Sequence, residues 1–345
     1  MRALEDEQAP ERIAAFVRAA SGEGDVSVSG VSRLAGGSSK QVWALDLRLG
    51  ARTLPLVLRI DPTEPTPGEG FAAQSGGFEG EFRLLQVMHR RGAPVPRVHW
   101  TCLDRDVLGG SFYLMDRIEG ETIPRRILRS DALVDARAKL PEQLGRALAR
   151  IHEADLAADG LEWLPGPPQG QSSPESQVAQ IRAGLDLHPE PLLASELAFR
   201  FLERNAPPER DRTLVHGDFR MGNVIVGPEG LRAVLDWELA HVGDPHEDLA
   251  WMCTKTWRFG KVDQPVGGVG PREPFYQAYE DESGRKLDRA ALRYWELLCS
   301  AKVVCVWVMQ VRAYLTGANP SVEQATIGRR IAETELDLLE ILGES

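Results

Sequence analysis

Hydrophobic residues follow two different patterns along the chain, and the pattern changes near residue 120. Before that point, alternating or β-branched apolar runs predict strands at 26–29, 42–47, 54–60, 95–98 and 111–115. Helical spacing predicts a leading helix over 11–19 and a second helix that begins near Phe78. Residues 61–80 are rich in Pro, Gly and Glu, which predicts a mobile loop.

After residue 120 the apolar spacing is mostly helical. It predicts helices over 140–152, 292–315 and 326–342, while the Pro- and Gly-rich stretch 164–175 predicts a linker or surface loop. The longest apolar run, 303–309, is much shorter than the roughly 20 residues that cross a bilayer, so we expect a buried helix and no membrane segment. The sequence therefore predicts an α+β protein with a small β-rich lobe, a short crossing and a larger helical lobe.

Composition narrows the class of protein. The chain has 345 residues, 43% of them hydrophobic and 26% charged, which is enough to bury a sizeable core. Its net charge of −11 argues against a nucleic acid partner, because nucleic acid binders usually carry a basic surface. The four cysteines form no Cys-x-x-Cys pair, so we expect free thiols, no zinc site and a cytoplasmic location.

A hairpin in the second half carries the most informative chemistry. Two apolar runs, 224–226 and 233–235, flank a Gly-Pro-Glu-Gly turn. Asp218 and Asn223 precede the first run and Asp236 follows the second, so the hairpin brings three oxygen-bearing side chains to one end. Such oxygens suit Mg²⁺, and a carboxylate beside a Mg²⁺ site suits phosphoryl transfer to a hydroxyl. A chance hairpin with surface carboxylates is the alternative.

Three blocks around this hairpin carry a family resemblance. They are His216-Gly-Asp-Phe-Arg-Met-Gly-Asn223, Leu235-Asp-Trp-Glu-Leu-Ala240 and Gly243-Asp-Pro-His-Glu-Asp-Leu-Ala-Trp251. In this order they resemble the aminoglycoside phosphotransferase family, which has a protein-kinase-like fold and phosphorylates small molecules. The resemblance implies an N-terminal nucleotide-binding lobe (1–115), a hinge (116–120) and a C-terminal catalytic and substrate-binding lobe (121–345). It also implies Asp218 as the catalytic residue, Asn223 and Asp236 as Mg²⁺ ligands, and ATP as co-substrate.

The nucleotide-binding residues are expected from the same resemblance. Gly36, Gly37, Ser38 and Ser39 lie where a phosphate-covering loop belongs, although the segment is not G-x-G-x-x-G. Where the family usually has a lysine on the third strand, this chain has Arg59. Its expected partner is Glu81, with Glu79 as the alternative. Adenine is expected to bind backbone groups near Asp116 and Ile118, with Met115 behind it.

Three further residues are expected to support the catalytic loop without taking part in the chemistry. His152 resembles a helix histidine found in the family and is interpreted as structural. His216 is expected to brace the loop, and Asp248 is expected to anchor it by hydrogen bonds.

The acceptor is less constrained than the reaction. Residues 251–261 combine Lys255, Arg258 and Lys261 with aromatic side chains, which favours an anionic, partly apolar acceptor over a polycationic aminoglycoside. A second basic cluster, Arg125, Arg126 and Arg129, lies just past the hinge, and a solvated basic patch is the alternative for both. Glu238, Trp257 and Arg258 are the candidate acceptor residues.

The sequences of the three blocks resemble the branch of the family that is linked to acyl-CoA dehydrogenases, whose members include 4-hydroxyacyl-CoA kinases. We therefore expect a kinase of a small hydroxylated metabolite such as a hydroxyacyl-CoA. An aminoglycoside O-phosphotransferase, a nucleotide-binding pseudokinase and a kinase of protein substrates are the alternatives. Arg59 in place of lysine is the only support for the pseudokinase. Monomer and homodimer both stay open.

Overall fold

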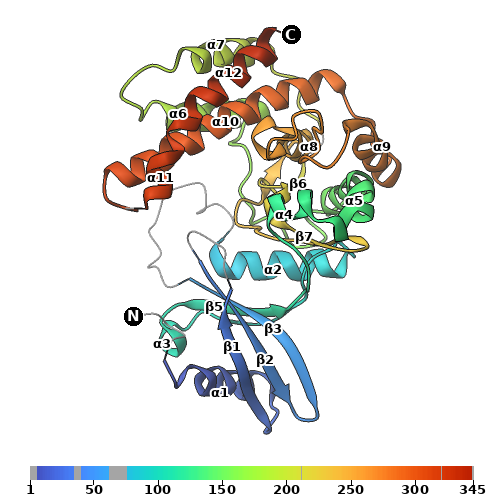
Figure 1. The fold of residues 1–345 in the computed structure, drawn as a ribbon, viewed down its shortest axis with the longest axis vertical. Helices are drawn as coiled ribbons and strands as arrows, with labels where there is room; N and C mark the ends of the chain where they lie inside the picture. The colour runs from blue at the N-terminus through green and yellow to red at the C-terminus, as the bar shows by residue number, and fades with distance from the viewer. Residues whose placement is uncertain (1–5, 35–39, 62–75, 211, 320, 344–345) are drawn as a thin grey trace.

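A five-stranded sheet forms most of the first lobe (Figure 1). The computed structural model describes residues 6–34, 40–61, 76–210, 212–319 and 321–343. The strands are β1 (Val26–Arg33), β2 (Gln41–Leu49), β3 (Arg52–Asp61), β4 (Val98–Cys102) and β5 (Ser111–Asp116). Their order is β1-β2-β3-β5-β4, and each neighbouring pair is antiparallel. The small antiparallel lobe that the sequence predicts is confirmed.

Helices of the first lobe lie against this sheet and at its border with the second lobe. They are α1 (Ala9–Ser21), α2 (Gly77–Arg90) and α3 (Arg105–Leu108). The apolar face of α1, with Ile13 and Val17 fully buried, shares a core with Leu45 and Leu58 of the sheet. Both helices predicted in this lobe are present, and most of the predicted loop 61–80 lies outside the described residues.

The second lobe is mostly helical and carries two short strand pairs. Its helices are α4 (Pro124–Arg129), η2 (Asp131–Leu133), α5 (Val134–His152), α6 (Ser173–Leu185), α7 (Leu193–Arg204), η3 (Met221–Asn223), α8 (His246–Cys253), η4 (Lys255–Arg258), α9 (Arg272–Ser283), α10 (Arg289–Leu315), α11 (Val322–Ile327) and α12 (Arg329–Gly343). Its strands are β6 (Thr213–Val215), β7 (Val224–Gly227), β8 (Gly230–Val234) and β9 (His241–Gly243). β7 and β8 form the predicted hairpin, and β6 pairs with β9.

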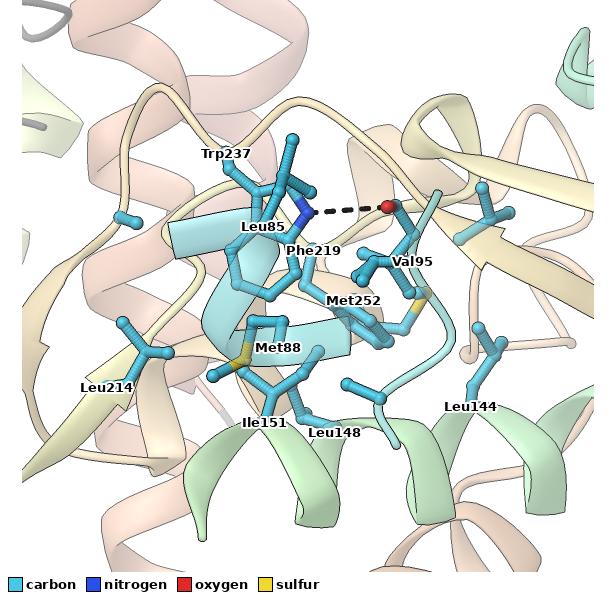
Figure 2. Close-up of a cluster of buried hydrophobic side chains, with 14 of the residues drawn as sticks. Leu85, Met88, Val95, Leu144, Leu148, Ile151, Leu214, Phe219, Trp237 and Met252 are labelled. Atoms are coloured by element: carbon cyan, nitrogen blue, oxygen red, sulfur yellow. Dashed lines mark hydrogen bonds between the residues drawn. The ribbon is translucent and has the colours of Figure 1, made fainter. Parts of the chain in front are cut away.

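One hydrophobic cluster joins the two lobes (Figure 2). Met88 of α2 packs in the same cluster as Ile151 of α5, together with Phe219 and Trp237 from the loops that flank the hairpin. These side chains are completely buried, and the Trp237 indole donates a hydrogen bond to the Val234 carbonyl (3.3 Å). The loop that carries Asp218 is therefore fixed to the core at Phe219, which limits how far the loop can move.

Two predicted boundaries differ from the structure. The strand predicted at 95–98 begins only at Val98, because Pro94 and Pro96 have no N–H to donate to a ladder. The predicted linker 164–175 ends at Ser172, which caps α6 in a reciprocal capping box with Glu175.

Helix α10 contains the apolar run predicted to be buried. By length and composition alone it could cross a membrane, but 61% of its most apolar stretch is buried inside the protein. Core helices of ordinary globular proteins meet the same criterion, so this is weak support for a membrane span.

Candidate active site

A loop between β6 and β7 carries Asp218, and buried side chains fix its start. Asp248 of α8 accepts hydrogen bonds from the backbone N–H groups of His216 (2.7 Å) and Gly217 (2.9 Å). His152 of α5 contacts the same carboxylate through Nε2 (3.1 Å), and its Nδ1 lies 3.0 Å from the Tyr279 hydroxyl. The expected anchoring by Asp248 and the structural role of His152 are confirmed.

Burial and hydrogen bonding act in opposite directions on these groups. Burial raises the pKa of Asp248, but the hydrogen bond from His152 and the nearby imidazoles outweigh it, so its pKa lies below the ordinary value. Burial lowers the pKa of His216 below its ordinary value even though Asp248 and Asp218 oppose this effect. Burial therefore favours the neutral form of His216. Its Nε2 hydrogen-bonds the Leu235 carbonyl (3.0 Å), and its Nδ1 accepts the backbone N–H of Asp218 (3.2 Å), so it braces the loop as expected.

Gly217 allows the turn that presents Asp218. Its φ is +81°, a conformation that costs a side-chain-bearing residue energy. A Cβ at this position would also lie 2.4 Å from the carbonyl oxygen of Leu239. Both observations require glycine immediately before Asp218.

Three side chains donate hydrogen bonds to the Asp218 carboxylate. Arg220 Nε lies 2.9 Å from Oδ1, Asn223 Nδ2 lies 2.6 Å from Oδ2, and Trp251 Nε1 lies 2.8 Å from Oδ1. The carboxylate keeps 18% of its surface exposed. It is thus fixed in orientation yet open on one side, as a group that orients an acceptor hydroxyl needs to be.

The hairpin brings Asn223 and Asp236 together. The backbone N–H of Leu235 donates to the Asn223 carbonyl (2.8 Å), so Asp236 follows directly after the contact between the two strands. Asn223 uses its amide nitrogen on Asp218, which leaves the amide oxygen outside those bonds. Asp236 has a φ of +61°, an uncommon conformation for a residue with a side chain.

These two oxygens fit a magnesium ion that is shared with phosphates. Among the described residues no group of three His, Cys, Asp or Glu side chains converges on a metal position. Mg²⁺ commonly takes only one or two protein oxygens and completes its shell with phosphates and water. The donors at Asn223 and Asp236 match that pattern and do not match a zinc site.

On the side of the sheet, Arg59 links this site to α2. Its Nη1 lies 2.7 Å from Glu81 Oε1, and its Nη2 lies 2.8 Å from Asp236 Oδ1. The expected ion pair of Arg59 with Glu81 is present, while Glu79 points outward to Arg83. Arg59 therefore holds Asp236 from the first lobe.

Lys40 is a second cation here that the sequence reasoning missed. Its Nζ lies 2.8 Å from Glu238 Oε2 and 3.5 Å from Glu81 Oε2. Its position directly after the Gly-rich segment could have indicated this role. In the β2–β3 pair Val42 lies opposite Arg59, so Lys40, two residues before Val42, lies beside the end of β3. Glu238, expected at the acceptor, is thus placed among the cations on the side of the first lobe.

The remaining nucleotide candidates are placed only in part. Gly36, Gly37, Ser38 and Ser39 lie outside the described residues. Met115 and Asp116 end β5; the Asp116 N–H donates to the Arg97 carbonyl (2.8 Å), and the Arg117 N–H donates to that of Pro55 (3.0 Å). In the described part of the chain no acceptor binds the N–H of Ile118, Glu119 or Gly120, so Ile118 is one of three available donors in the expected hinge.

Two of the basic residues expected at the acceptor, Arg258 and Lys255, are engaged elsewhere. Arg258 donates to the backbone carbonyls of Cys253 (2.8 Å) and Val262 (3.0 Å), and Lys255 pairs with Asp337 (2.7 Å) of α12. Both side chains therefore stabilise the fold through contacts inside the protein. The sequence pattern predicted more basic side chains facing an acceptor than the structure places there. Trp257 does lie at the site.

Trp257 belongs to an aromatic group beside Asp218. Its ring centroid is 5.4 Å from that of Trp251, and the guanidinium of Arg220 lies 4.7 Å from the Trp257 centroid. Sequence reasoning missed the part played by Arg220 and by Trp251. Arg220 lies inside the first of the three blocks, two residues after Asp218, and this position could have indicated its place at the site.

Comparison with known proteins gives the family. The model of the phosphotransferase enzyme family (APH) matches residues 30–295. Acyl-CoA dehydrogenase family member 10 of Mus musculus is 34% identical over 182 residues, which are 51% of this chain and 16% of that protein. The matched segment therefore spans about a sixth of that relative's length.

Solved structures agree on the fold. A putative aminoglycoside phosphotransferase from Ralstonia eutropha JMP134 superposes with a TM-score of 0.73 at 20% identity, covering 97% of this chain and 98% of the other. An aminoglycoside phosphotransferase mutant in ternary complex with ADP and hygromycin B gives 0.57 at 18% identity, covering 95% and 97%. The two-lobe fold and the family match together assign this chain to the phosphotransferase enzyme family.

Proposed function

We propose that the chain transfers the γ-phosphoryl group of ATP to a hydroxyl of a small molecule in a Mg²⁺-dependent reaction. The arrangement of Asp218 carries the proposal. Its carboxylate is fixed by three donors, remains open on one side, and contacts Asn223, which together with Asp236 is the proposed pair of Mg²⁺ ligands. A fixed carboxylate next to a metal site is what phosphoryl transfer to an alcohol requires.

Nucleotide binding is assigned to the first lobe and the hinge. Ile118 offers a backbone N–H to adenine, with Met115 and Asp116 beside it. Arg59 and Lys40 supply positive charge to the phosphates, and Glu81 holds both cations in place. Gly36, Gly37, Ser38 and Ser39 are proposed to cover the phosphates.

In this mechanism Asp218 orients the acceptor hydroxyl and receives its proton late in the transfer. The acceptor oxygen forms a bond to phosphorus as the bond between phosphorus and the ADP oxygen breaks. Mg²⁺, when bound by Asn223 and Asp236, neutralises charge on the phosphates. Arg59 lies 2.8 Å from Oδ1 of Asp236, so Oδ2 of the same carboxylate would be the oxygen that holds the ion.

For the acceptor, we propose an anionic hydroxylated metabolite such as a hydroxyacyl-CoA. The similarity to acyl-CoA dehydrogenase family proteins supports this class. The structural relative that was crystallised with hygromycin B keeps aminoglycoside O-phosphotransfer as the second candidate. The Asp218, Asn223 and Asp236 cluster argues against a pseudokinase. We further propose a cytoplasmic monomer or homodimer.

A panel of acceptors tests the proposal. Mg²⁺-dependent ATP consumption is measured with 4-hydroxyacyl-CoAs, aminoglycosides, choline, homoserine and sugars. We expect turnover with the hydroxyacyl-CoAs that stops on chelation of Mg²⁺. Preference for a kanamycin-type substrate would refute the acceptor class, and ATP binding without turnover of any acceptor would favour the pseudokinase.

A further inference from the structure

Arg220 forms an ion pair with Asp218, and within the described residues some of its N–H donors have no acceptor. Its Nε donates to both carboxylate oxygens of Asp218, at 2.9 and 3.2 Å. In the part of the chain that the structure describes, neither Nη1 nor Nη2 has a hydrogen-bond acceptor. The side chain is 26% exposed, so four N–H groups remain available beside the proposed reaction centre.

The guanidinium is held in this position from three sides. Asp218 binds its Nε, and the ring of Trp257 lies 4.7 Å from its central carbon. Gly222 provides the third side, because a Cβ at that position would lie 2.1 Å from Nη1. A guanidinium fixed in this way is preorganised, so it loses little conformational freedom when an anion binds.

Three other cationic side chains of the second lobe already have partners inside the protein. Lys302 lies 3.0 Å from Glu247 Oε1, and Lys255 lies 2.7 Å from Asp337 Oδ1. Arg258 donates to backbone carbonyls. Arg220 is therefore the candidate for the anion-binding role that the sequence pattern predicted for Arg258.

We propose that Arg220 binds an oxyanion at the reaction centre through Nη1 and Nη2; this rests on the proposed phosphotransferase function. Two sources share that chemistry: the phosphoryl group in transfer, and an anionic group of the acceptor. A planar guanidinium binds the oxygens of either in a two-point contact. In both cases the charge at Arg220 opposes the binding of a polycationic acceptor.

Two probes separate the sources. The first is aluminium fluoride, which mimics the transferring phosphoryl group when it binds with MgADP. The second is a 4-hydroxyacyl-CoA, bound in the presence of MgADP. Isothermal titration measures the affinity for MgADP alone, for MgADP with aluminium fluoride, and for the acyl-CoA. None of these measurements requires turnover.

Arg220→Met and Gly222→Ala are the test variants. The methionine removes the charge, and the alanine displaces the guanidinium while retaining it, which keeps the test available if Arg220→Met does not fold. Arg330→Met is the matched control, because Arg330 also lies over an indole (Trp307, 4.9 Å) but does not contact Asp218.

We expect both test variants to weaken the binding of one probe by about tenfold or more, as for loss of a hydrogen bond to a charged group, with MgADP affinity within about twofold. Loss of the aluminium fluoride effect identifies the phosphoryl group, and loss of acyl-CoA affinity identifies the acceptor. Unchanged affinity for both probes, or an equal loss in Arg330→Met, would overturn the inference. Absence of turnover in the unaltered protein would refute the proposed function and leave this result standing.

Discussion

Lys302 of α10 stabilises a buried carboxylate behind the catalytic loop, and replacing it should cost the protein much of its stability. Its Nζ lies 3.0 Å from Glu247 Oε1, while His241 Nε2 lies 3.1 Å from Glu247 Oε2. Lys302 is 6% exposed and Glu247 2%. Lys302→Met keeps the volume and apolar stem of the side chain but leaves Glu247 with one partner.

The size of the effect follows from the pKa of Glu247. Burial raises that pKa, but Lys302 and His241 outweigh it and bring it from 4.5 to about 2. A difference of this size corresponds to about 3 kcal/mol of stability, present above pH 4.5 and lost as the pH falls toward 2. Removing one partner of a buried ion pair costs about 3–5 kcal/mol. We therefore expect Lys302→Met to lower the free energy of unfolding by a similar amount at pH 7.

The loss should depend on pH in a defined direction. Without Lys302, one of the two groups that lower the pKa of Glu247 is lost, so the carboxylate takes up a proton more readily at pH 5 than at pH 7 and part of the cost is relieved. Urea unfolding followed by circular dichroism at pH 7 and pH 5 measures both values. The double variant Lys302→Met with Glu247→Gln should recover most of the stability. A loss under about 1 kcal/mol at pH 7, or an equal loss at both pH values, would refute the reasoning.

Two further predictions concern close packing and the nucleotide side. A Cβ at Gly145 of α5 would lie 2.2 Å from the Phe275 carbonyl oxygen, so Gly145→Ala should lower the free energy of unfolding by about 2 kcal/mol; a more stable variant in thermal unfolding would contradict this contact. Arg59→Met leaves Glu81 buried without its 2.7 Å partner and should raise KM for ATP at least about tenfold. Adding Glu81→Gln should restore stability but not KM, and recovery of both would show that Arg59 is only structural.

Local sequence was sufficient to predict the hairpin at the candidate site. Asn223 and Asp236 flank the two strands of this hairpin, and Asp218 lies on the loop just before it, so their placement needs no distant contact. The pairing of Arg59 with Glu81 was expected from the family resemblance; in the structure Glu81 is buried beside Arg59, while Glu79 pairs with Arg83.

Contacts between distant segments could not be predicted from local patterns. Lys255 is neutralised by Asp337 and Glu340 of α12, about 80 residues later, so its charge in the sequence gave no sign of its pairing. Trp251 lies in the buried helix α8, and only the packed fold shows that its indole donates to Asp218. Such roles depend on tertiary packing.

The most direct test of the account is Asp218→Asn, with turnover and nucleotide affinity measured on the same preparation. Asparagine keeps the shape of the side chain but neither receives a proton nor supports the full charge that Arg220, Asn223 and Trp251 bind. We predict that phosphoryl transfer falls by at least about a thousandfold while the affinity for MgATP changes by less than about threefold. Turnover close to that of the unaltered protein would remove Asp218 from the chemistry and contradict the proposed mechanism.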